Sequence, residues 1–493
     1  MNILLVSPRY PDTFWSFKAA LKFISKKAAG PPLGILTISS LLPDTWKRKL
    51  VDLNVNSLKD ADILWADYVF IGAMSVQADS AADVIRRCKD LKTKIVAGGP
   101  LFTGDPDPYM HLDHLILNEA EITLPSFLED LKNNCAKKIY TTSEFADMKA
   151  SPPPDYSVIK ASSYSQLSVQ YSRGCPFSCE FCEITSLLGH KVRVKTTDQI
   201  LQELTSIYET GHRGNVFFVD DNFIGNRHKL KTSLLPAISQ WNSERNHPFT
   251  FTTEASIDLA DDRELMSGMA KAGFEKVFVG IETPDEDSLK ECNKKLNIER
   301  NLMESVQAIH SAGIEVSAGF IVGFDSDTST IFQRQIDFIQ QSGIITAMVG
   351  LLNAPNRTPL FQRLKSEGRI LTSHSGDNTN YSMNFVPKMN KELLLNGYQH
   401  ILNGIYSNKA YYLRLKSFIS GFKPGATMKS RMNLEKILAL FRSIYYIGIL
   451  GKGRRYYWKL FWWSLLRRPQ MFPMAITYTI YGYHFRKVYR IDH

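Results

Sequence analysis

The stretch YSRGCPFSCEFCEI, residues 171–184, places Cys175, Cys179 and Cys182 in the spacing Cys-x3-Cys-x2-Cys. The chain has 493 residues and only six cysteines, which is too few for a disulfide framework. Clustered thiols therefore indicate metal or redox chemistry in a reduced compartment. A structural zinc site normally needs a fourth ligand at close spacing, and the nearest candidate, His190, lies at an irregular offset. Three cysteines after an expected strand favour a [4Fe–4S] cluster with one iron open to a small-molecule ligand.

The overall composition is that of a globular protein, with 44% hydrophobic and 22% charged residues. A chain of this length is expected to form two or three domains. The other cysteines, Cys88, Cys135 and Cys292, fall in expected helices or at domain edges. We expect them to be ordinary buried or surface thiols.

The cysteines follow the first of six apolar runs that read as strands. These runs cover residues 167–173, 214–222, 249–256, 276–283, 315–324 and 346–355. Helical patterns separate them, for example at 196–211 and 301–314. This alternation predicts a partial (β/α)6 barrel over residues 167–370, with its active site at the carboxyl ends of the strands.

Polar or glycine residues stand at the ends of these expected strands. They are Asp220, Asp221, Asn222, Glu254, Ser256, Glu282, Gly323 and Asn353. The Asp-Asp-Asn run has a plain interpretation, in which it caps a turn or helix. Because it follows the apolar run VFFV on the expected active edge, we favour a functional role. Glu282, after VFVGI, receives the same interpretation.

The first 140 residues also alternate, with expected strands at 2–8, 49–55, 67–74, 94–100 and 113–119. This pattern predicts a doubly wound, Rossmann-like parallel sheet, whose ligands bind beyond the carboxyl ends of the strands. Gly-rich turns at 31–34, 71–77 and 97–100 fall on that edge and favour a bound cofactor. A Pro/Ser-rich linker at 141–166 joins this domain to the barrel.

Residues 371–493 are expected to form a mainly helical, basic and aromatic region. From residue 411 onward there are 16 Lys and Arg residues against two acids, Glu435 and Asp492. The segment 469–485 carries no charge but is short for a membrane span. Aromatic-basic segments such as the one with Trp458, Trp462 and Trp463 lie in the headgroup interface of membranes. The alternative is a helical cap on the barrel.

The motif CPFSCEFC resembles the signature of the radical S-adenosylmethionine (SAM) superfamily. The resemblance implies that the open iron chelates the amino and carboxylate groups of SAM. The motifs FVDDN, TTEAS, VGIET and GFIVGF resemble the family's SAM-binding strands, in the same order. They imply SAM contacts by Asp220, Asp221, Asn222, Glu254, Ser256, Glu282 and Gly323.

The front region resembles the cobalamin-binding domain placed ahead of many radical SAM enzymes. The resemblance rests on PPLGILTISSLLP, VAGGP and LNEAEITLPSFLEDL. The residues expected to contact cobalamin are Ser75, Val76, Gln77, Gly98, Gly99 and Glu119. The Asp-x-His-x-x-Gly motif of other cobalamin proteins is absent from the sequence, so we expect no histidine on the lower face of the corrin. The alternative is a fold of this type without a cofactor.

Nearly the full chain looks like the family that contains the hopanoid methylases. This implies a methylase in which a 5′-deoxyadenosyl radical takes hydrogen from an unactivated substrate carbon and methylcobalamin donates the methyl group. Two other interpretations stay open: a radical SAM enzyme of another reaction type, such as cyclisation or oxidation, and a non-catalytic iron–sulfur or zinc module. The sequence leaves the substrate and the carbon modified undetermined.

The expected partners follow from the same interpretation. They are a small hydrophobic substrate, with a lipid favoured if the tail meets a membrane, and a one-electron reductant such as a flavodoxin or ferredoxin. Nucleic acid is not expected, because the helical tail contains no recognised RNA module. The amino-terminus shows no secretory signal, so we expect a cytoplasmic protein, with peripheral contact at the inner membrane face through its tail.

Overall fold

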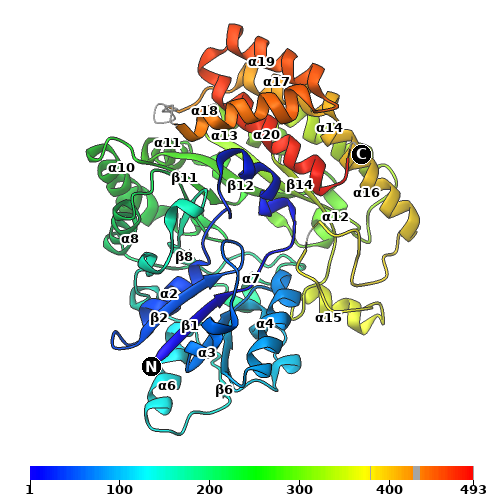
Figure 1. Cartoon of the computed structure of the whole chain (residues 1–493). Coiled ribbons are helices and arrows are strands. Elements are labelled where there is room, and N and C mark those ends of the chain that lie inside the picture. Colours follow the sequence, from blue (N-terminus) through cyan, green and yellow to red (C-terminus); the bar gives the residue numbers. More distant parts are fainter. Residues whose placement is uncertain (378, 426–433, 492–493) are drawn as a thin grey trace.

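The computed structural model describes residues 1–377, 379–425 and 434–491. Two parallel sheets, each flanked by helices, lie one above the other, and a layer of carboxyl-terminal helices covers the second sheet (Figure 1). The predicted α/β fold with a helical carboxyl-terminal region is confirmed.

The first sheet has six parallel strands in the order β2-β1-β3-β4-β5-β6. The strands are β1 (Asn2–Ser7), β2 (Lys47–Asp52), β3 (Tyr68–Gly72), β4 (Lys94–Gly98), β5 (His114–Ile116) and β6 (Ile139–Tyr140). The helices between them are α2 (Leu33–Leu41), α3 (Asp60–Trp65), α4 (Ala78–Asp90), α5 (Pro100–Gly104) and α6 (Ala120–Lys132). Apolar side chains fill both faces of the sheet, as a doubly wound fold requires.

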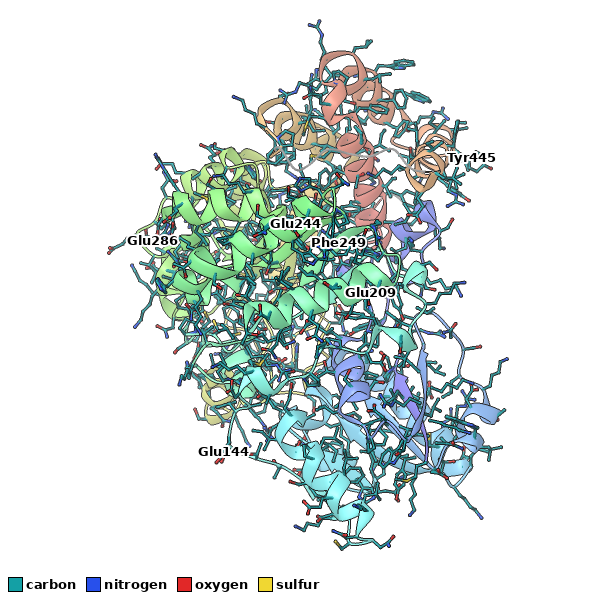
Figure 2. All side chains as sticks on the ribbon, turned by 90° about the vertical axis from the view of Figure 1, so that its left-hand side faces the viewer. Glu144, Glu209, Glu244, Phe249, Glu286 and Tyr445 are labelled. Atoms are coloured by element: carbon teal, nitrogen blue, oxygen red, sulfur yellow. The ribbon has the colours of Figure 1, made fainter. Side chains whose placement is uncertain are left out.

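The second sheet also has six parallel strands, in the order β14-β13-β12-β11-β10-β7. They are β7 (Leu167–Val169), β10 (Gly214–Phe218), β11 (Phe249–Glu254), β12 (Phe274–Glu282), β13 (Glu315–Val322) and β14 (Ala347–Leu351). The main helices on its outer side are α8 (Thr197–Glu209), α10 (Leu235–Glu244), α11 (Arg263–Ala272), α13 (Leu302–Ser311) and α14 (Ile331–Ser342). Figure 2 shows this helical layer, with Glu209 and Glu244 at its surface. The two outer strands, β7 and β14, are not paired with each other among the described residues, so the barrel is open.

The carboxyl-terminal region is helical, as expected. Its elements are α15 (Pro359–Ser366), α16 (Lys391–Tyr406), α17 (Asn408–Gly421), α18 (Leu434–Ser443), the π-helical turn η12 (Ile444–Ile449), α19 (Arg454–Arg467) and α20 (Phe472–Val488). No helix within the described residues is both long enough and apolar enough to cross a bilayer.

A segment near the amino-terminus leaves the first sheet and reaches the far end of the molecule. The Phe14 ring stacks on Phe485 of α20 at a centroid distance of 4.2 Å. The backbone carbonyl of Phe14 lies 3.0 Å from Nε2 of the buried His484. In Figure 1 this dark blue segment runs beside the red α20. The first and last parts of the chain therefore share one core with the barrel.

Candidate active site

The cysteine loop begins at the short strand β8 (Ser172–Arg173) and ends at the helix α7 (Ile184–Leu188). Gly174 lies at φ +92°, and a Cβ there would stand 2.5 Å from the carbonyl oxygen of Lys191. The backbone N–H of Cys175 donates to the Gly189 carbonyl at 3.1 Å, and that of Cys182 donates to the Cys179 carbonyl at 3.1 Å. Gly174, before the first cysteine, is thus a backbone requirement of the loop.

The three thiols are free and partly buried, and they interact electrostatically with one another. Burial raises the pKa of Cys182 to about 12 and also raises the pKa values of Cys175 and Cys179. No three His, Cys, Asp or Glu side chains in the described part of the chain converge closely enough to hold a single metal ion. Three soft sulfur donors spread along one loop fit a multi-iron cluster.

Two arginines tie the base of this loop to the first sheet. Arg173 makes a bidentate ion pair with Glu121 at 2.8 and 3.0 Å, and Arg193 makes one with Glu119 at 2.6 and 2.8 Å. Burial raises the pKa of Glu121, but Arg173 outweighs this effect and holds it below its ordinary value. Glu119, an expected cobalamin contact, also accepts from the Ala146 N–H at 2.6 Å. Its carboxylate therefore joins the two domains.

The carboxylate of Asp220 supports the strand that carries the cysteines. It accepts a hydrogen bond from the Tyr171 N–H at 3.1 Å and two more from the N–H and hydroxyl of Ser172. Burial raises the pKa of Asp220 to about 7. Within the Asp-Asp-Asn run, Asp220 is therefore the residue that stabilises the backbone before the cysteine loop.

Asp221 and Glu254 are carboxyl groups at the strand ends whose pKa values are raised. Oδ2 of Asp221 is buried without a hydrogen-bond partner, and the side chain lies within electrostatic range of Cys175. Burial raises the pKa of Asp221 to about 6. Burial and the neighbouring Asp221 and Asp220 raise the pKa of Glu254 to about 8. Such a pair fits a ligand that brings positive charge and hydrogen-bond donors, as the amino and hydroxyl groups of SAM do.

Asn222 and Ser256 shape the same edge. Oδ1 of Asn222 accepts from the Ser256 N–H at 3.2 Å, and the Ser256 hydroxyl donates to Asp258 at 2.5 Å. This contact fixes the end of β10 against the end of β11.

Glu282, the last residue of β12, interacts electrostatically with Cys179 and pairs with a lysine. Its backbone is left-handed, at φ +65°, and its carboxylate lies 2.8 Å from Nζ of Lys294. Lys294 interacts electrostatically with all three cysteine thiols. A Cβ at Gly280 would lie 2.2 Å from the Glu282 carboxylate, so glycine leaves room for the pair.

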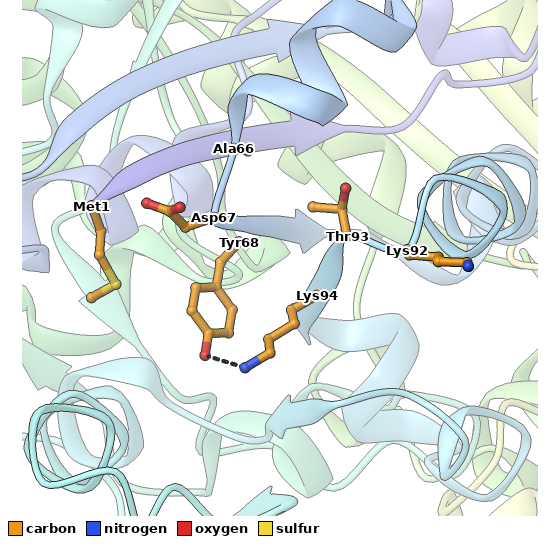
Figure 3. Close-up of a pocket in the computed structure, with 7 residues that line it drawn as sticks. All are labelled: Met1, Ala66, Asp67, Tyr68, Lys92, Thr93 and Lys94. Carbon is orange, nitrogen blue, oxygen red and sulfur yellow. Dashed lines mark hydrogen bonds between the residues drawn. The ribbon is translucent and has the colours of Figure 1, made fainter.

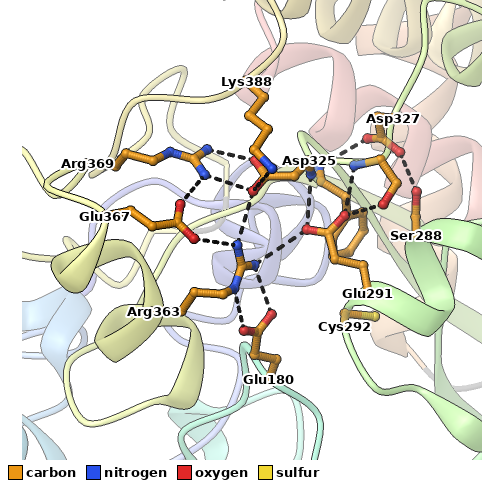
Figure 4. A network of polar contacts seen from close by, with 12 residues as sticks. Glu180, Ser288, Glu291, Cys292, Asp325, Asp327, Arg363, Glu367, Arg369 and Lys388 are labelled. Carbon is orange, nitrogen blue, oxygen red and sulfur yellow. Dashed lines mark hydrogen bonds and ion pairs between the residues drawn. The ribbon is translucent and has the colours of Figure 1, made fainter.

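A second ion-pair network holds the middle of the cysteine loop (Figure 4). Glu180, next to Cys179, makes a bidentate pair with Arg363 of α15 at 2.7 and 3.0 Å. Arg363 also contacts Asp325 at 3.1 Å, and Asp325 pairs with Arg369 at 2.6 and 2.7 Å. Burial raises the pKa of Asp325, but the hydrogen bonds from Arg369 and Arg363 lower it to about 2.

Gly323, an expected SAM contact, begins the loop that contains Asp325. It lies at φ +106°, and its N–H donates to Asp327 at 2.8 Å. Ser288 donates to the other oxygen of Asp327 at 2.8 Å. The end of β13 is therefore fixed to the helix that follows β12.

The carboxyl edge of the first sheet carries the remaining predicted residues. Ser75, Val76 and Gln77 form a short turn after β3, and a Cβ at Gly376 would lie 2.6 Å from the Val76 nitrogen. The Gln77 side chain donates to the Pro8 carbonyl and accepts from the Met74 N–H, so it holds this turn in place.

Gly98 and Gly99 are required by the backbone at the same edge. A Cβ at Gly98 would lie 2.6 Å from the Ile116 carbonyl, and Gly99 lies at φ +96°. Neither 71–77 nor 97–100 contains a histidine or cysteine. The edge thus presents backbone, small side chains and the exposed Met74, and these two segments offer no histidine or cysteine to a bound group.

The opposite edge of this sheet has a shallow hollow lined by Tyr68, Lys92 and Lys94 (Figure 3). Its one hydrogen bond in that figure joins Nζ of Lys94 to the Tyr68 hydroxyl at 3.4 Å. It lies where the strands begin, on the edge away from the cysteines, and takes no part in the site.

Sequence reasoning did not find Lys294, Arg173, Arg193, Glu180 or Arg363. Arg173 and Glu180 stand inside the cysteine motif, and their charge in a partly buried loop is a usable signal. Lys294 and Arg363 are ordinary charges of helical segments in the sequence, and only the fold brings them to the loop.

Comparison with known proteins defines the class. The profile of the radical SAM superfamily matches residues 169–339, and a domain of unknown function (DUF4070) matches residues 358–492. The open parallel barrel and its three-cysteine loop are those of a radical SAM enzyme, which uses a [4Fe–4S] cluster and SAM.

Two relatives align over almost the whole chain. An uncharacterised methyltransferase of Synechocystis sp. is 39% identical over 98% of this chain and 91% of its own length. The hopanoid C-2 methylase of Rhodopseudomonas palustris is 34% identical over 94% of this chain and 90% of its own length. The chain belongs to the radical SAM methyltransferase family that includes these two proteins.

Solved structures agree on the fold. The radical enzyme OxsB with aqua-cobalamin and SAM bound has a TM-score of 0.65 at 17% identity, covering 99% of this chain and 80% of OxsB. TsrM from Kitasatospora setae, with cobalamin and a [4Fe–4S] cluster bound, has a TM-score of 0.59 at 12% identity, covering 92% and 98%. The arrangement of both sheets is thus shared with these enzymes.

Proposed function

We propose that the protein is a cobalamin-dependent radical SAM methylase that methylates an unactivated carbon of a hydrophobic substrate, with a hopanoid-like lipid as the substrate class. The observation that carries the proposal is that the Lys294–Glu282 pair and the Asp221 carboxylate, whose Oδ2 has no hydrogen-bond partner, lie within electrostatic range of the cysteine thiols at one edge. The identity of 34% to a hopanoid C-2 methylase supports the substrate class.

In this proposal Cys175, Cys179 and Cys182 hold the [4Fe–4S] cluster. Asp221 and Glu254 receive the charged and donor groups of SAM, with Asn222, Ser256, Glu282 and Gly323 around them. Asp220 acts through the backbone of β8. When bound, cluster and SAM supply a hydrogen-abstracting radical and cobalamin supplies the methyl group.

The chain's own residues would position these groups and exclude water. Ser75, Val76, Gly98 and Gly99 would support the corrin, while Gln77 and Glu119 shape its edge through the contacts described above. The functional units are residues 1–140 for cobalamin, 141–166 as a linker, 167–370 for radical chemistry and 371–493 as the helical region. A flavodoxin or ferredoxin would supply single electrons, and the carboxyl-terminal region would contact the inner membrane face.

Anaerobic reconstitution of the wild type and of Cys179→Ala tests the reaction class. We expect the wild type to release 5′-deoxyadenosine and a methylated lipid, and the variant to release neither. Deoxyadenosine without methyl transfer, and without retained cobalamin, would indicate another radical reaction. A reduced wild-type cluster that leaves SAM intact would remove the enzyme proposal.

A further inference from the structure

One part of the surface is unusually apolar. Among the described residues, 23 large hydrophobic side chains are exposed, and 11 of them lie between residues 434 and 466. This segment comprises α18, η12 and α19, which form an antiparallel helical hairpin. Exposed apolar side chains gathered on one face indicate an interaction site.

The apolar residues form a stripe along α18 and η12. Leu434, Leu438, Phe441, Tyr445 and Ile449 recur every three or four residues, which places them on one side of the helix. Phe441 is 63% exposed and Ile449 is 53% exposed. Figure 2 shows Tyr445 at the edge of the molecule.

The second helix adds exposed apolar side chains to the hairpin. Trp462 and Leu466 of α19 are exposed, as is Leu450 in the turn between the helices. We call this surface, on α18, η12 and α19, the C-terminal apolar face.

The helices already have a packed side, so the exposed stripe is not an unfinished core. Ala439 and Ile447 are buried against Tyr457 and Phe461 of α19 and against α20. The Ser443 hydroxyl lies 2.9 Å from the Tyr457 hydroxyl, and the Trp458 indole N–H donates to the Gly448 carbonyl at 2.9 Å. The hairpin is therefore held with its stripe facing outward.

The charge around the stripe is almost entirely positive. Residues 434–468 contain eight Lys and Arg residues and one acid, Glu435, which pairs with Lys26 at 2.9 Å. Lys452, Arg454 and Arg455 are exposed at the turn of the hairpin. Tyr445, Tyr446 and Trp462 are exposed on the same segment, and apolar, aromatic and basic side chains together are the pattern of segments that lie in a bilayer interface.

We propose that the C-terminal apolar face docks on an anionic lipid bilayer, with the α18–η12 stripe in the headgroup–acyl boundary and the hairpin turn on the lipid phosphates. A second copy of this chain is disfavoured as the occupant, because it would oppose two strongly basic surfaces. The docking surface is the hairpin, and α20 is buried behind it. This inference deepens the proposed function by giving the enzyme a route to a membrane-resident substrate.

Vesicle sedimentation of the full-length, cluster-loaded protein tests the inference without any turnover. We expect binding to phosphatidylcholine–phosphatidylglycerol vesicles that weakens with salt, and much weaker binding to phosphatidylcholine alone. The triple variant Phe441→Ser, Ile449→Ser, Leu450→Ser should bind roughly tenfold or more weakly. The control is Leu64→Ser, Leu371→Ser, Leu413→Ser, which removes equally exposed side chains elsewhere and should bind like the wild type.

Two further measurements distinguish loss of membrane binding from misfolding of the triple variant. Arg454→Gln with Arg455→Gln leaves the stripe intact and should reduce both binding and its salt dependence. Brominated lipids should quench a tryptophan signal that Trp462→Phe removes. Equal loss in stripe and control variants, or no wild-type binding, overturns the proposal. The proposal is also overturned if the wild type does not bind vesicles but forms a concentration-dependent dimer that the stripe variant does not form. The occupant of the face would then be a second copy of the chain.

Failure of this inference and failure of the proposed function can be told apart. Methyl transfer to a detergent-dispersed lipid should survive in the stripe variant, because the substituted side chains lie on the outer helical layer.

Discussion

Lys294 is a positive charge close to the three cysteines and to the Glu282 carboxylate. Its ammonium group lies 2.8 Å from Glu282 and attracts all three thiolates. A bound cluster with thiolate ligands carries negative charge, so a nearby cation should ease its reduction. The residue therefore has two separable effects, one on stability and one on the cluster's redox potential.

Lys294→Met should leave Glu282 buried without its partner and lower the free energy of unfolding by about 3–5 kcal/mol. It should also make the cluster harder to reduce. Lys294→Met with Glu282→Gln should recover most of the stability and, because it also removes the negative charge near Cys179, part of the potential. Denaturant unfolding and a redox titration followed by electron paramagnetic resonance check the two effects, and an unchanged potential in Lys294→Met alone would contradict the electrostatic role.

Glu254→Gln tests the raised pKa at the SAM edge. A carboxyl whose folded pKa is about 8 binds its proton more tightly than in the unfolded chain, where the pKa is about 4.5. Its stabilising effect is full below the unfolded pKa and is lost as pH rises through about 8. The variant should therefore melt above the wild type at pH 9 and alongside it near pH 5.

The measurement is a melting curve of the cluster-loaded protein without SAM, at both pH values. Glu264→Gln, on the exposed surface, is the control and should show no such crossover. If the melting temperature of Glu254→Gln shifts equally at both pH values, the stability change does not come from ionising a buried Glu254 carboxyl.

The sequence was sufficient for the residues whose position follows from a strand end. The cysteines come after β7 and the short β8, Asp221 comes shortly after β10, and Glu254 is the last residue of β11, so the carboxyl-end rule for the barrel strands located them. It could not separate Asp220 from Asp221, because that difference depends on which carboxylate meets the backbone of Ser172. The roles of Lys294 and Arg363 could not be predicted from the sequence, because only the fold brings them to the cysteine loop. Arg363 and its partner Glu180, for example, are 183 residues apart in the sequence.

At the scale of elements, α15 holds the cysteine loop through the Arg363 side chain and through the Leu360 N–H, which donates to the Glu180 carbonyl at 3.0 Å. Arg363 contacts both Glu180 and Asp325, so it connects the loop to the end of β13 (Figure 4). Lysine at this position keeps the charge but cannot form the bidentate pair.

Arg363→Lys should therefore loosen the loop without removing any ligand. We expect faster loss of the cluster in air, by a few-fold, and a broader electron paramagnetic resonance signal with SAM bound. Lys365→Met, an exposed lysine of the same helix, serves as the control. If both variants retain the cluster and its signal as the wild type does, the network has no positioning role.

Helix α20 shows where element-scale prediction was incomplete. The sequence predicts that the uncharged run at 469–485 is short for a membrane span and that the aromatic-basic tail lies in the membrane interface, with a helical cap as the alternative. The structure buries this helix, including Tyr478 and Phe485, and leaves the exposed apolar stripe to the charged segment before it. The absence of Lys, Arg, Asp and Glu from this run reflects its burial in the core. Composition alone does not distinguish a buried helix from one that lies on a membrane surface.

At the scale of the whole molecule, the two sheets are joined by the carboxylates that begin α6. The side chains of Glu121 and Arg173 are only slightly exposed, so reversing one charge should destabilise the protein strongly. Glu121→Arg should lower the melting temperature by several degrees and weaken cluster retention. Adding Arg173→Glu should restore part of both, whereas reversing the exposed Asp83 of the Asp83–Arg86 pair should change neither. Failure of the double variant to recover would argue against a direct pair.

The carboxyl-terminal helix completes the core, and its removal should unfold the chain rather than release a tail. Phe485 stacks on Phe14, and Tyr489 stacks on Tyr406 at a centroid distance of 5.7 Å. Deleting residues 472–493 would expose these aromatic surfaces, and losing even one such buried ring costs about 3–5 kcal/mol. We expect the truncated protein to be insoluble or to lack a cooperative melting transition. Tyr489→Ala should lower the melting temperature by several degrees, whereas Trp462→Ala on the exposed face should not. A truncated protein that melts like the full chain would show that the core closes without α20.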